Sequence, residues 1–145
     1  MYLDTSVIVK RYVAEPDSDA VDALVVGHSL MTSEIAVTEF WSARLAKERA
    51  GQISAVWRRR IWDVFVDEIE SRVLTLVKVD GALLREANEV LLKVYPVVPL
   101  RSLDAIHLAA YAASRAGPLF SADQRMVRAA LALGFEVVEL PVRAG

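Results

Sequence analysis

Short hydrophobic runs alternate with longer segments of helical periodicity along the whole chain. Runs typical of buried strands occur at 1–3, 30–32, 73–79, 118–121 and 136–140. The 3.6-residue spacing of hydrophobic positions between them predicts helices at 6–12, 18–27, 33–51, 53–72, 80–94, 103–115 and 124–133. Because strands separated by helices are typical of a parallel sheet covered on both faces, the pattern predicts an α/β fold.

Polar residues and glycines mark the ends of these segments. Ser6, Ser33 and Asp80 begin helical runs, and their side chains are expected to cap the helices. Gly51 and Gly134 follow helical runs and predict where two of the helices end. The segment 15–18 contains a proline and predicts a break between the first two helices.

The composition is that of a globular protein. The chain has 145 residues, 54% of them hydrophobic, and a mean hydropathy of +0.33. These values exclude a disordered chain and predict a single domain over 1–145. No hydrophobic run reaches the roughly 20 residues that a membrane span needs. Cysteine is absent, which excludes disulfides and cysteine-based zinc sites. Because Met1 leads directly into a strand, we expect no signal peptide and a cytoplasmic location.

Two acidic residues follow predicted strands. Asp4 comes directly after the run 1–3, and Asp123 closely follows the run 118–121. The carboxyl ends of parallel strands lie at one edge of a sheet, where open α/β sheets bind their ligands. We therefore expect both carboxylates at the same edge.

Two further acids lie on predicted helices. Asp104 is in the first turn of the helix 103–115, whose alanine, isoleucine and leucine content predicts burial on nearly all sides. Glu39 falls in the middle of a hydrophobic helix face, where a carboxylate needs a partner. That face is formed by Ile35, Ala36, Phe40, Ala43, Ala46 and Ala50. Four carboxylates converging on one edge would bind a hard divalent cation.

The two acids on helices are also compatible with purely structural roles. Glu39 is compatible with the edge of the hydrophobic face or with an ion pair to an arginine. Asp104 is compatible with stabilisation of a helix N-terminus by negative charge, typically about 0.3–1 kcal/mol. His107, one turn after Asp104, is most simply a buried histidine with satisfied hydrogen bonds, while a phosphate contact or a proton relay stays open.

The acids after strands share another interpretation, because aspartate commonly caps a helix. Asp123 is suited to cap the helix 124–133, with Arg125 as an ion-pair partner. Capping explains Asp4 less well, because two hydroxyl residues follow it directly and already offer capping oxygens. Hydroxyl groups beside the acids are suited to orient metal-bound waters, and the candidates are Thr5, Ser6 and Ser121.

The same residues resemble the motifs of PIN-domain ribonucleases, most closely those of the VapC toxins of bacterial and archaeal toxin–antitoxin modules. The resemblance covers essentially the whole chain, and the segment 100–108 is its most specific part. The matching motifs are Asp4-Thr5-Ser6, Glu39, Arg101-Ser102-Leu103-Asp104-Ala105-Ile106-His107 and Ser121-Ala122-Asp123.

This resemblance implies a single PIN-like domain with a five-stranded parallel sheet between helices and an acidic pocket that binds Mg²⁺ or Mn²⁺. It implies hydrolysis of RNA phosphodiester bonds by a metal-activated water. Asp4 and Asp104 are expected as direct metal ligands, and Asp123 and Glu39 as ligands of a second ion or as residues that position the attacking water. The resemblance further implies a cognate antitoxin bound to the two long helices, and a homodimer.

Basic residues near these acids are candidates for contacts to RNA phosphates. The net charge of −2, from 17 basic and 19 acidic residues, argues mildly against a general nucleic-acid binder. Acids gathered in a metal site would nevertheless hide a local basic surface from this sum. The candidates are Lys10, Arg11, Arg101 and Arg125.

Aromatic residues divide into core and surface candidates. Trp41 and Trp62 fall outside the hydrophobic helix faces and indicate an exposed aromatic surface for a partner. The four-residue spacing within the segment 53–72 predicts core positions for Trp57, Ile61, Phe65 and Ile69.

Other functions of α/β folds fit less well. A phosphoacceptor receiver domain needs adjacent acids after the first strand and a lysine near a late strand end, and the chain offers Asp4 alone there. A phosphatase with an aspartate nucleophile needs a second aspartate at position 6, which is serine. A non-catalytic PIN-like module that binds proteins stays open, and metal-dependent cleavage of RNA separates it from a nuclease.

Overall fold

The computed structural model describes residues 1–13 and 17–140. Over these residues the strands are β1 (Tyr2–Leu3), β2 (Leu30–Ser33), β3 (Leu74–Val77), β4 (Leu119–Phe120) and β5 (Val137–Val138). The helices are α1 (Thr5–Tyr12), α2 (Ser18–Val25), α3 (Ile35–Arg49), α4 (Ala55–Glu70), α5 (Gly81–Val94), α6 (Ser102–Ser114) and α7 (Gln124–Ala132). Part of the break expected at 15–18 lies outside the described residues. None of the described helices is long and apolar enough to cross a membrane.

The strands form one parallel sheet in the order β3-β2-β1-β4-β5. Tyr2 in β1 pairs with Met31 in β2 on one side and with Leu119 in β4 on the other. The predicted α/β fold with a five-stranded parallel sheet is confirmed. Because β1 is central, the residues that follow it emerge in the middle of the sheet edge.

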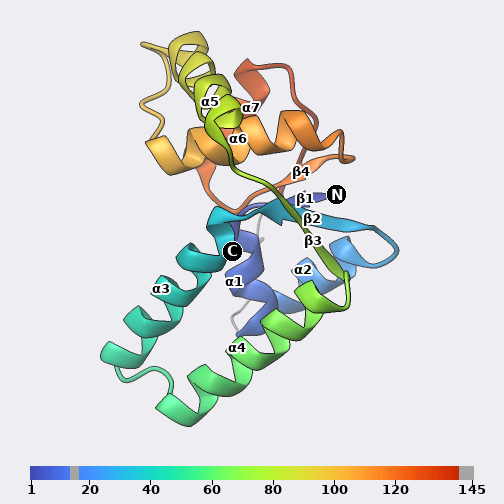
Figure 1. Cartoon of the computed structure of the whole chain (residues 1–145), viewed down its shortest axis with the longest axis vertical. Coiled ribbons are helices and arrows are strands. Elements are labelled where there is room, and N and C mark those ends of the chain that lie inside the picture. The colour runs from blue at the N-terminus through green and yellow to red at the C-terminus, as the bar shows by residue number, and fades with distance from the viewer. Residues whose placement is uncertain (14–16, 141–145) are drawn as a thin grey trace, which may run out of the picture.

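Helices cover both faces of the sheet. In Figure 1, α5, α6 and α7 lie above the strands, and α1 to α4 lie below them. Tyr2 and Leu119 point into the upper core, whereas their neighbours Leu3 and Phe120 point into the lower core. This division follows from the alternation of side chains along a strand.

Two helix starts differ from the expected caps. The side chain of Asp4 caps α1 by accepting a hydrogen bond from the N–H of Val7, so the assignment of that cap to Ser6 was wrong. Ser33 ends β2 and Glu34 holds the cap position of α3. Asp80 caps α5 as predicted, through the N–H of Leu83.

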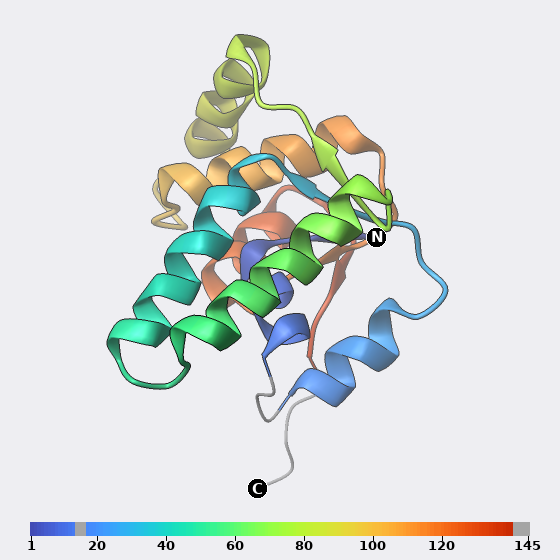
Figure 2. The ribbon, with the colours of Figure 1, turned by 60° about the horizontal axis from the view of Figure 1, so that its bottom comes forward.

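The buried face of α3 also differs from the prediction. Ala36, Phe40 and Arg44 are buried, whereas Ala46 and Ala50 are exposed. Figure 2 shows the reason: α3 and α4 form a hairpin whose connecting turn lies far from the sheet, so that the last turns of α3 have no sheet to cover.

One tryptophan, Trp57, is exposed although the sequence pattern predicted a core position for it. Trp57 is 57% exposed and is not a core residue, although Phe65 from the same stripe is fully buried. Trp41 and Trp62 are half-buried and pack edge to face, with ring centroids 4.6 Å apart. Trp62 therefore belongs to the lower core in part, and Trp57 provides the more exposed indole.

Candidate active site

Asp4 is enclosed by hydrogen-bond donors at the end of β1. Its residue is 2% exposed. One carboxylate oxygen, Oδ1, accepts hydrogen bonds from the hydroxyl of Ser6 at 2.6 Å and from the N–H of Val7 at 3.1 Å. The other, Oδ2, accepts from the hydroxyl of Ser121 at 2.6 Å. The carboxylate is therefore fixed by groups from the first turn of α1 and by the serine that follows β4.

The same two serines join the ends of the central strands. The hydroxyl of Ser6 accepts a hydrogen bond of 2.9 Å from the N–H of Ala122, and the hydroxyl of Ser121 accepts one of 3.0 Å from the N–H of Asp123. The predicted meeting of the β1 and β4 ends at one edge is thus confirmed, and the serines add to the backbone hydrogen bond from the N–H of Asp4 to the carbonyl of Phe120.

Burial is the main influence on the charge of Asp4. It raises the pKa of the carboxyl group above its usual value, because the charged form is poorly solvated. Hydrogen bonds from Ser121 and Ser6, and the charge of His107, act in the opposite direction without cancelling the effect.

Glu39 projects from α3 toward the same edge, with its side chain 24% exposed. Its Oε1 accepts a hydrogen bond of 2.7 Å from the hydroxyl of Thr5 and lies 2.7 Å from Nε2 of His107. Burial alone would raise the pKa of Glu39, but the hydrogen bond and charge of His107, with the Thr5 hydroxyl, lower it below its usual value. Its partner is therefore a histidine, not the arginine considered from the sequence.

His107 is a buried histidine with partners on both ring nitrogens, as its simplest interpretation predicted. Its ring is nearly fully buried, and Nδ1 lies 2.9 Å from the hydroxyl of Tyr2. Its position three residues after Asp104 placed both side chains on one face of α6, which was the available signal. The partners on β1 and α3 come from distant parts of the sequence and could not be read from it.

Asp104 and Asp123 share the guanidinium of Arg101. Nε of Arg101 donates to Oδ2 of Asp104 at 3.1 Å, and Nη2 donates to Oδ2 of Asp123 at 2.9 Å. Asp104 also accepts a hydrogen bond from the backbone N–H of Arg101 at 3.3 Å, which stabilises the start of α6. These interactions raise the pKa of Arg101 above its usual value, with Asp104 the larger influence.

Asp123 also caps α7, as its alternative interpretation predicted. Its Oδ1 accepts hydrogen bonds from the N–H groups of Arg125 at 2.8 Å and Met126 at 3.4 Å. The expected ion pair between Asp123 and the side chain of Arg125 is replaced by the pair with Arg101.

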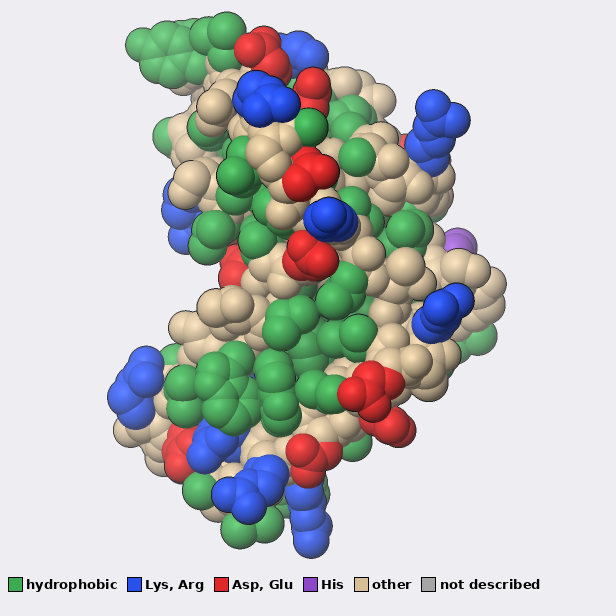
Figure 3. Space-filling model, viewed as in Figure 1, with side chains coloured by type: hydrophobic (Ala, Val, Ile, Leu, Met, Phe, Trp, Pro, Cys, Tyr) green, Lys and Arg blue, Asp and Glu red, His purple; other side chains and the backbone are tan. Residues whose placement is uncertain are grey.

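A cavity of about 440 Å³ lies between α3 and the start of α6. Its lining residues are Glu39, Arg101, Ser102, Leu103 and Asp104. The space-filling view shows the left edge of the molecule hollowed between its upper and lower halves, the region where these two helices approach (Figure 3). The cavity joins Glu39 to Asp104, so that two of the four acids line one open space.

The four acids are held in separate groups. Asp4 is bound by serines, Glu39 by Thr5 and His107, and the remaining two by Arg101. Within residues 1–13 and 17–140 no three histidine or acidic side chains are placed to hold a metal ion. The convergence of four carboxylates on one ion therefore stays a prediction.

Comparison with known proteins places the chain in a family. The PIN domain model matches residues 1–131. The chain belongs to the PIN-domain family. It is 36% identical over 143 residues to Ribonuclease VapC46 of Mycobacterium tuberculosis, and the match covers 95% of each chain.

A solved structure shows the same fold. The crystal structure of Mycobacterium tuberculosis VapC20, described as a sarcin–ricin loop cleaving toxin, matches with a TM-score of 0.69 and 18% identity. The match covers 92% of this chain and 95% of that one. PIN-domain membership excludes the receiver and phosphatase alternatives considered from the sequence.

Two of the basic residues predicted to contact RNA form ion pairs with acidic side chains of this PIN domain. Lys10 pairs with Asp17 at 3.3 Å, and Arg11 pairs with Glu68 on α4 at 3.0 Å. Both lie in the last turn of α1, at the opposite end from the capping Asp4. Contacts of these residues and of Arg101 and Arg125 to RNA stay predictions.

Proposed function

We propose that this PIN domain is a metal-dependent endoribonuclease that acts as the toxin of a toxin–antitoxin module. The observation that carries the proposal is the 36% identity to a curated ribonuclease over 95% of both chains. The position of Asp4 and Asp123 at the carboxyl edge of the sheet supports it, since α/β sheets bind ligands there.

The oxygen-rich side chains at this edge fit a hard divalent cation such as Mg²⁺ or Mn²⁺. Asp104 and Asp123 come from different elements, and each directs an oxygen at the same guanidinium group. A single cationic partner, Arg101, thus already bridges both carboxylates. We infer that these two acids, with Asp4 and Glu39, are the residues that would hold Mg²⁺ or Mn²⁺, with Asp4 and Asp104 as direct ligands.

The chemistry supplied by a bound divalent ion is polarisation of the scissile phosphate and activation of the attacking water. The protein contributes fixed positions for the acidic side chains. Ser6 and Ser121 orient the Asp4 carboxylate, and Thr5 orients that of Glu39. Preorganised oxygens of this kind lose little conformational entropy when a ligand binds.

Arg101 is suited to contact an RNA phosphate at the rim of the cavity. Its side chain is 61% exposed, although it is held by two carboxylates. A guanidinium binds both carboxylates and phosphates through paired N–H groups. It can therefore exchange one of these acceptors for the other. Arg125, Lys10 and Arg11 are further candidates for contacts along the RNA backbone.

One observation favours a non-catalytic PIN module that binds proteins. The guanidinium of Arg101 already binds both Asp104 and Asp123, so that these acids have a cationic partner without an added ion. The two functions differ in one measurable respect, which is cleavage of RNA.

The decisive experiment is cleavage of total bacterial RNA by the purified protein, with the new RNA ends determined by sequencing. We expect cleavage at defined sites with Mg²⁺ or Mn²⁺ and none with EDTA. Asp4→Asn and Asp104→Asn are expected to abolish it while the proteins stay folded. The matched control is Asp22→Asn, because Asp22 is exposed on α2 and lies in no described ion pair. Undiminished cleavage by both site variants would reject the proposed role of these acids.

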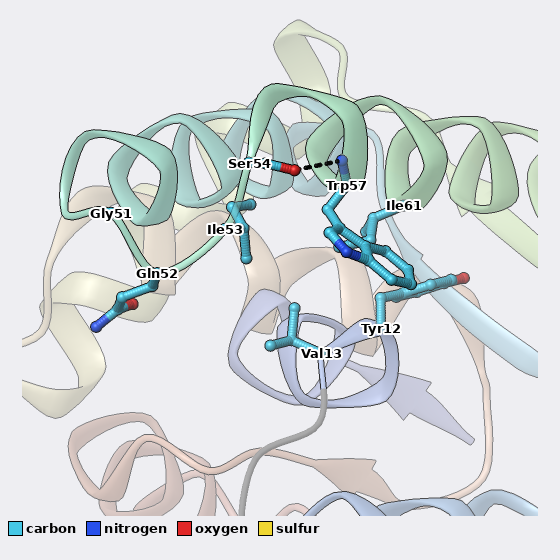
Figure 4. Close-up of a pocket in the computed structure, with 8 residues that line it drawn as sticks. All are labelled: Tyr12, Val13, Gly51, Gln52, Ile53, Ser54, Trp57 and Ile61. Carbon is cyan, nitrogen blue, oxygen red and sulfur yellow. Dashed lines mark hydrogen bonds between the residues drawn. The ribbon is translucent and has the colours of Figure 1, made fainter.

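We also propose that the cognate antitoxin binds the hairpin of α3 and α4. Hydrophobic side chains gather between these helices on the face seen in Figure 3. A cavity of about 390 Å³ lies between α4 and the end of α1, and Figure 4 shows Trp57, Ile53 and Val13 directed into it. Apolar pockets of this kind are typical of sites that receive anchoring side chains.

The partner proposal is tested by coexpression with the protein encoded beside it, followed by affinity purification. We expect copurification with the wild-type chain and its loss with Trp57→Glu. Retention of the partner by Trp57→Glu would place the interface elsewhere. The proposed homodimer is tested by light scattering of the purified chain.

A further inference from the structure

His107 links the buried first strand to the carboxylate of Glu39. Its residue is 2% exposed. Nδ1 lies 2.9 Å from the hydroxyl of Tyr2, and Nε2 lies 2.7 Å from Oε1 of Glu39. The three residues belong to α6, β1 and α3. Because both ring nitrogens have a partner, the imidazole cannot flip without losing a hydrogen bond.

The direction of these hydrogen bonds depends on the Tyr2 hydroxyl, which can donate to Nδ1 or accept from it. A phenol carries its proton at neutral pH and has one hydrogen to donate. When that hydrogen is donated to Nδ1, Nδ1 is an acceptor and the ring proton resides on Nε2. The N–H group then points at Oε1 of Glu39, which is the acceptor 2.7 Å away. In that arrangement Tyr2 selects the tautomer that can bind Glu39.

This contact determines which oxygen of Glu39 faces the cavity. Oε1 is occupied by both His107 and the hydroxyl of Thr5. No hydrogen bond to Oε2 occurs among the described residues, and Glu39 lines the cavity of about 440 Å³. Fixing one oxygen therefore leaves the other for a ligand in the cavity.

We propose that His107 is a positioning residue for Glu39 in RNA cleavage, and that Tyr2 acts through it by selecting its tautomer. The inference rests on the proposed ribonuclease function. Its structural alternative is a histidine that merely fills the core between α6 and the sheet. A positioning residue needs hydrogen on one particular ring nitrogen, whereas a histidine that only fills the core does not.

Amide substitutions separate the two alternatives. The amide nitrogen of glutamine reaches the position of Nε2, whereas that of asparagine reaches the position of Nδ1. We expect His107→Asn to lower kcat for RNA cleavage by about 10- to 100-fold with little change in KM, as for other residues that orient a ligand side chain. His107→Gln is expected to retain most of the wild-type kcat. Thermal unfolding of both variants shows whether they are equally folded.

A measurement that does not depend on cleavage uses the nitrogen NMR signals of the imidazole. The chain has two histidines, and the exposed His28 is removed without disturbing the site by His28→Gln. In EDTA at neutral pH we expect His107 to be the Nε2–H tautomer. Tyr2→Phe keeps the aromatic ring and removes the hydroxyl, and is expected to change the tautomer population.

The outcomes separate this inference from the proposed function. If the wild-type protein cleaves no RNA, the proposed function fails, and the tautomer of His107 still decides the contact with Glu39. Hydrogen on Nδ1 of His107 in the wild-type protein, in the neutral or the doubly protonated ring, would overturn the inference even if RNA is cleaved. Equal loss of kcat in the glutamine and asparagine variants, at equal stability, would also overturn it.

Discussion

The guanidinium of Arg101 donates a hydrogen bond of 2.9 Å to Asp123, which lies 22 residues later in the chain. This contact joins the start of α6 to the start of α7, because Arg101 holds the cap position of one helix and Asp123 that of the other. A second bond from the same side chain holds Asp104. Arg101, at the start of α6, is therefore a cationic partner of two of the proposed metal-binding acids.

Removal of this cation is expected to expose the two acids. Arg101→Ala frees Asp104 and Asp123, and the repulsion between them favours an added cation. We expect Mn²⁺ to bind the variant more tightly than the wild-type protein, measured by calorimetry or by the paramagnetic signal of free Mn²⁺. The matched control is Arg125→Ala, since the Arg125 side chain makes no described ion pair. Unchanged or weaker Mn²⁺ binding by Arg101→Ala would show that the acids do not hold the ion together.

Asp4 is expected to limit the stability of the metal-free protein at neutral pH. Because burial raises its pKa, folding favours the protonated carboxyl, and this favourable contribution is lost as the pH rises through the folded-state pKa. Asp4→Asn removes the buried charge and retains a capping side chain. We expect the variant to be more stable than the wild type at pH 7, with the difference shrinking toward the unfolded pKa of about 3.9.

The measurement for Asp4→Asn is urea unfolding in EDTA, followed by tryptophan fluorescence between pH 4 and pH 7. A variant that is less stable than the wild type at pH 7 would contradict the expectation. That result would mean that the hydroxyls of Ser6 and Ser121 stabilise the carboxylate by more than its burial costs.

Ser121 is expected to contribute to stability through two buried contacts. Ser121→Ala removes the donor to Oδ2 of Asp4 and the acceptor for the N–H of Asp123. Leaving such groups without partners typically costs about 1–3 kcal/mol in the free energy of unfolding. The control is Ser42→Ala, an exposed position on α3, for which a change within about 0.5 kcal/mol is expected. Equal stability of the two variants would show that water replaces the Ser121 hydroxyl.

Two aromatic residues from one predicted stripe are expected to differ in their contribution to the core. Phe65 is fully buried and packs against Phe40 with ring centroids 4.3 Å apart, whereas Trp57 is 57% exposed. Phe65→Ala is expected to lower the free energy of unfolding by about 3–5 kcal/mol. Trp57→Ala is expected to lower it by less than about 1 kcal/mol. Urea unfolding compares the two, and similar losses would indicate that Trp57 is a core residue after all.

Local patterns predicted most of the elements, because helix and strand formation depend on the period of hydrophobic residues over a few turns. The order of strands and helices agrees with the prediction, and so does the cap at Asp80. The predicted buried face of α3 was wrong, because a helical wheel assumes that the whole helix packs against the core. Only the placement of the α3–α4 turn away from the sheet shows that Ala46 and Ala50 face solvent.

The sequence by itself determined the alternation of strands and helices, since this is a local property of residue type and spacing, and it offered the four acids as candidates. The tertiary structure decided which partner each acid has: serines for Asp4, His107 for Glu39, and Arg101 for Asp104 and Asp123. Those partners lie up to 117 residues away, at distances set by sheet order and helix packing. Contacts between segments so far apart carry no signal in the periodicity of a single sequence, because each depends on how every layer between them is packed.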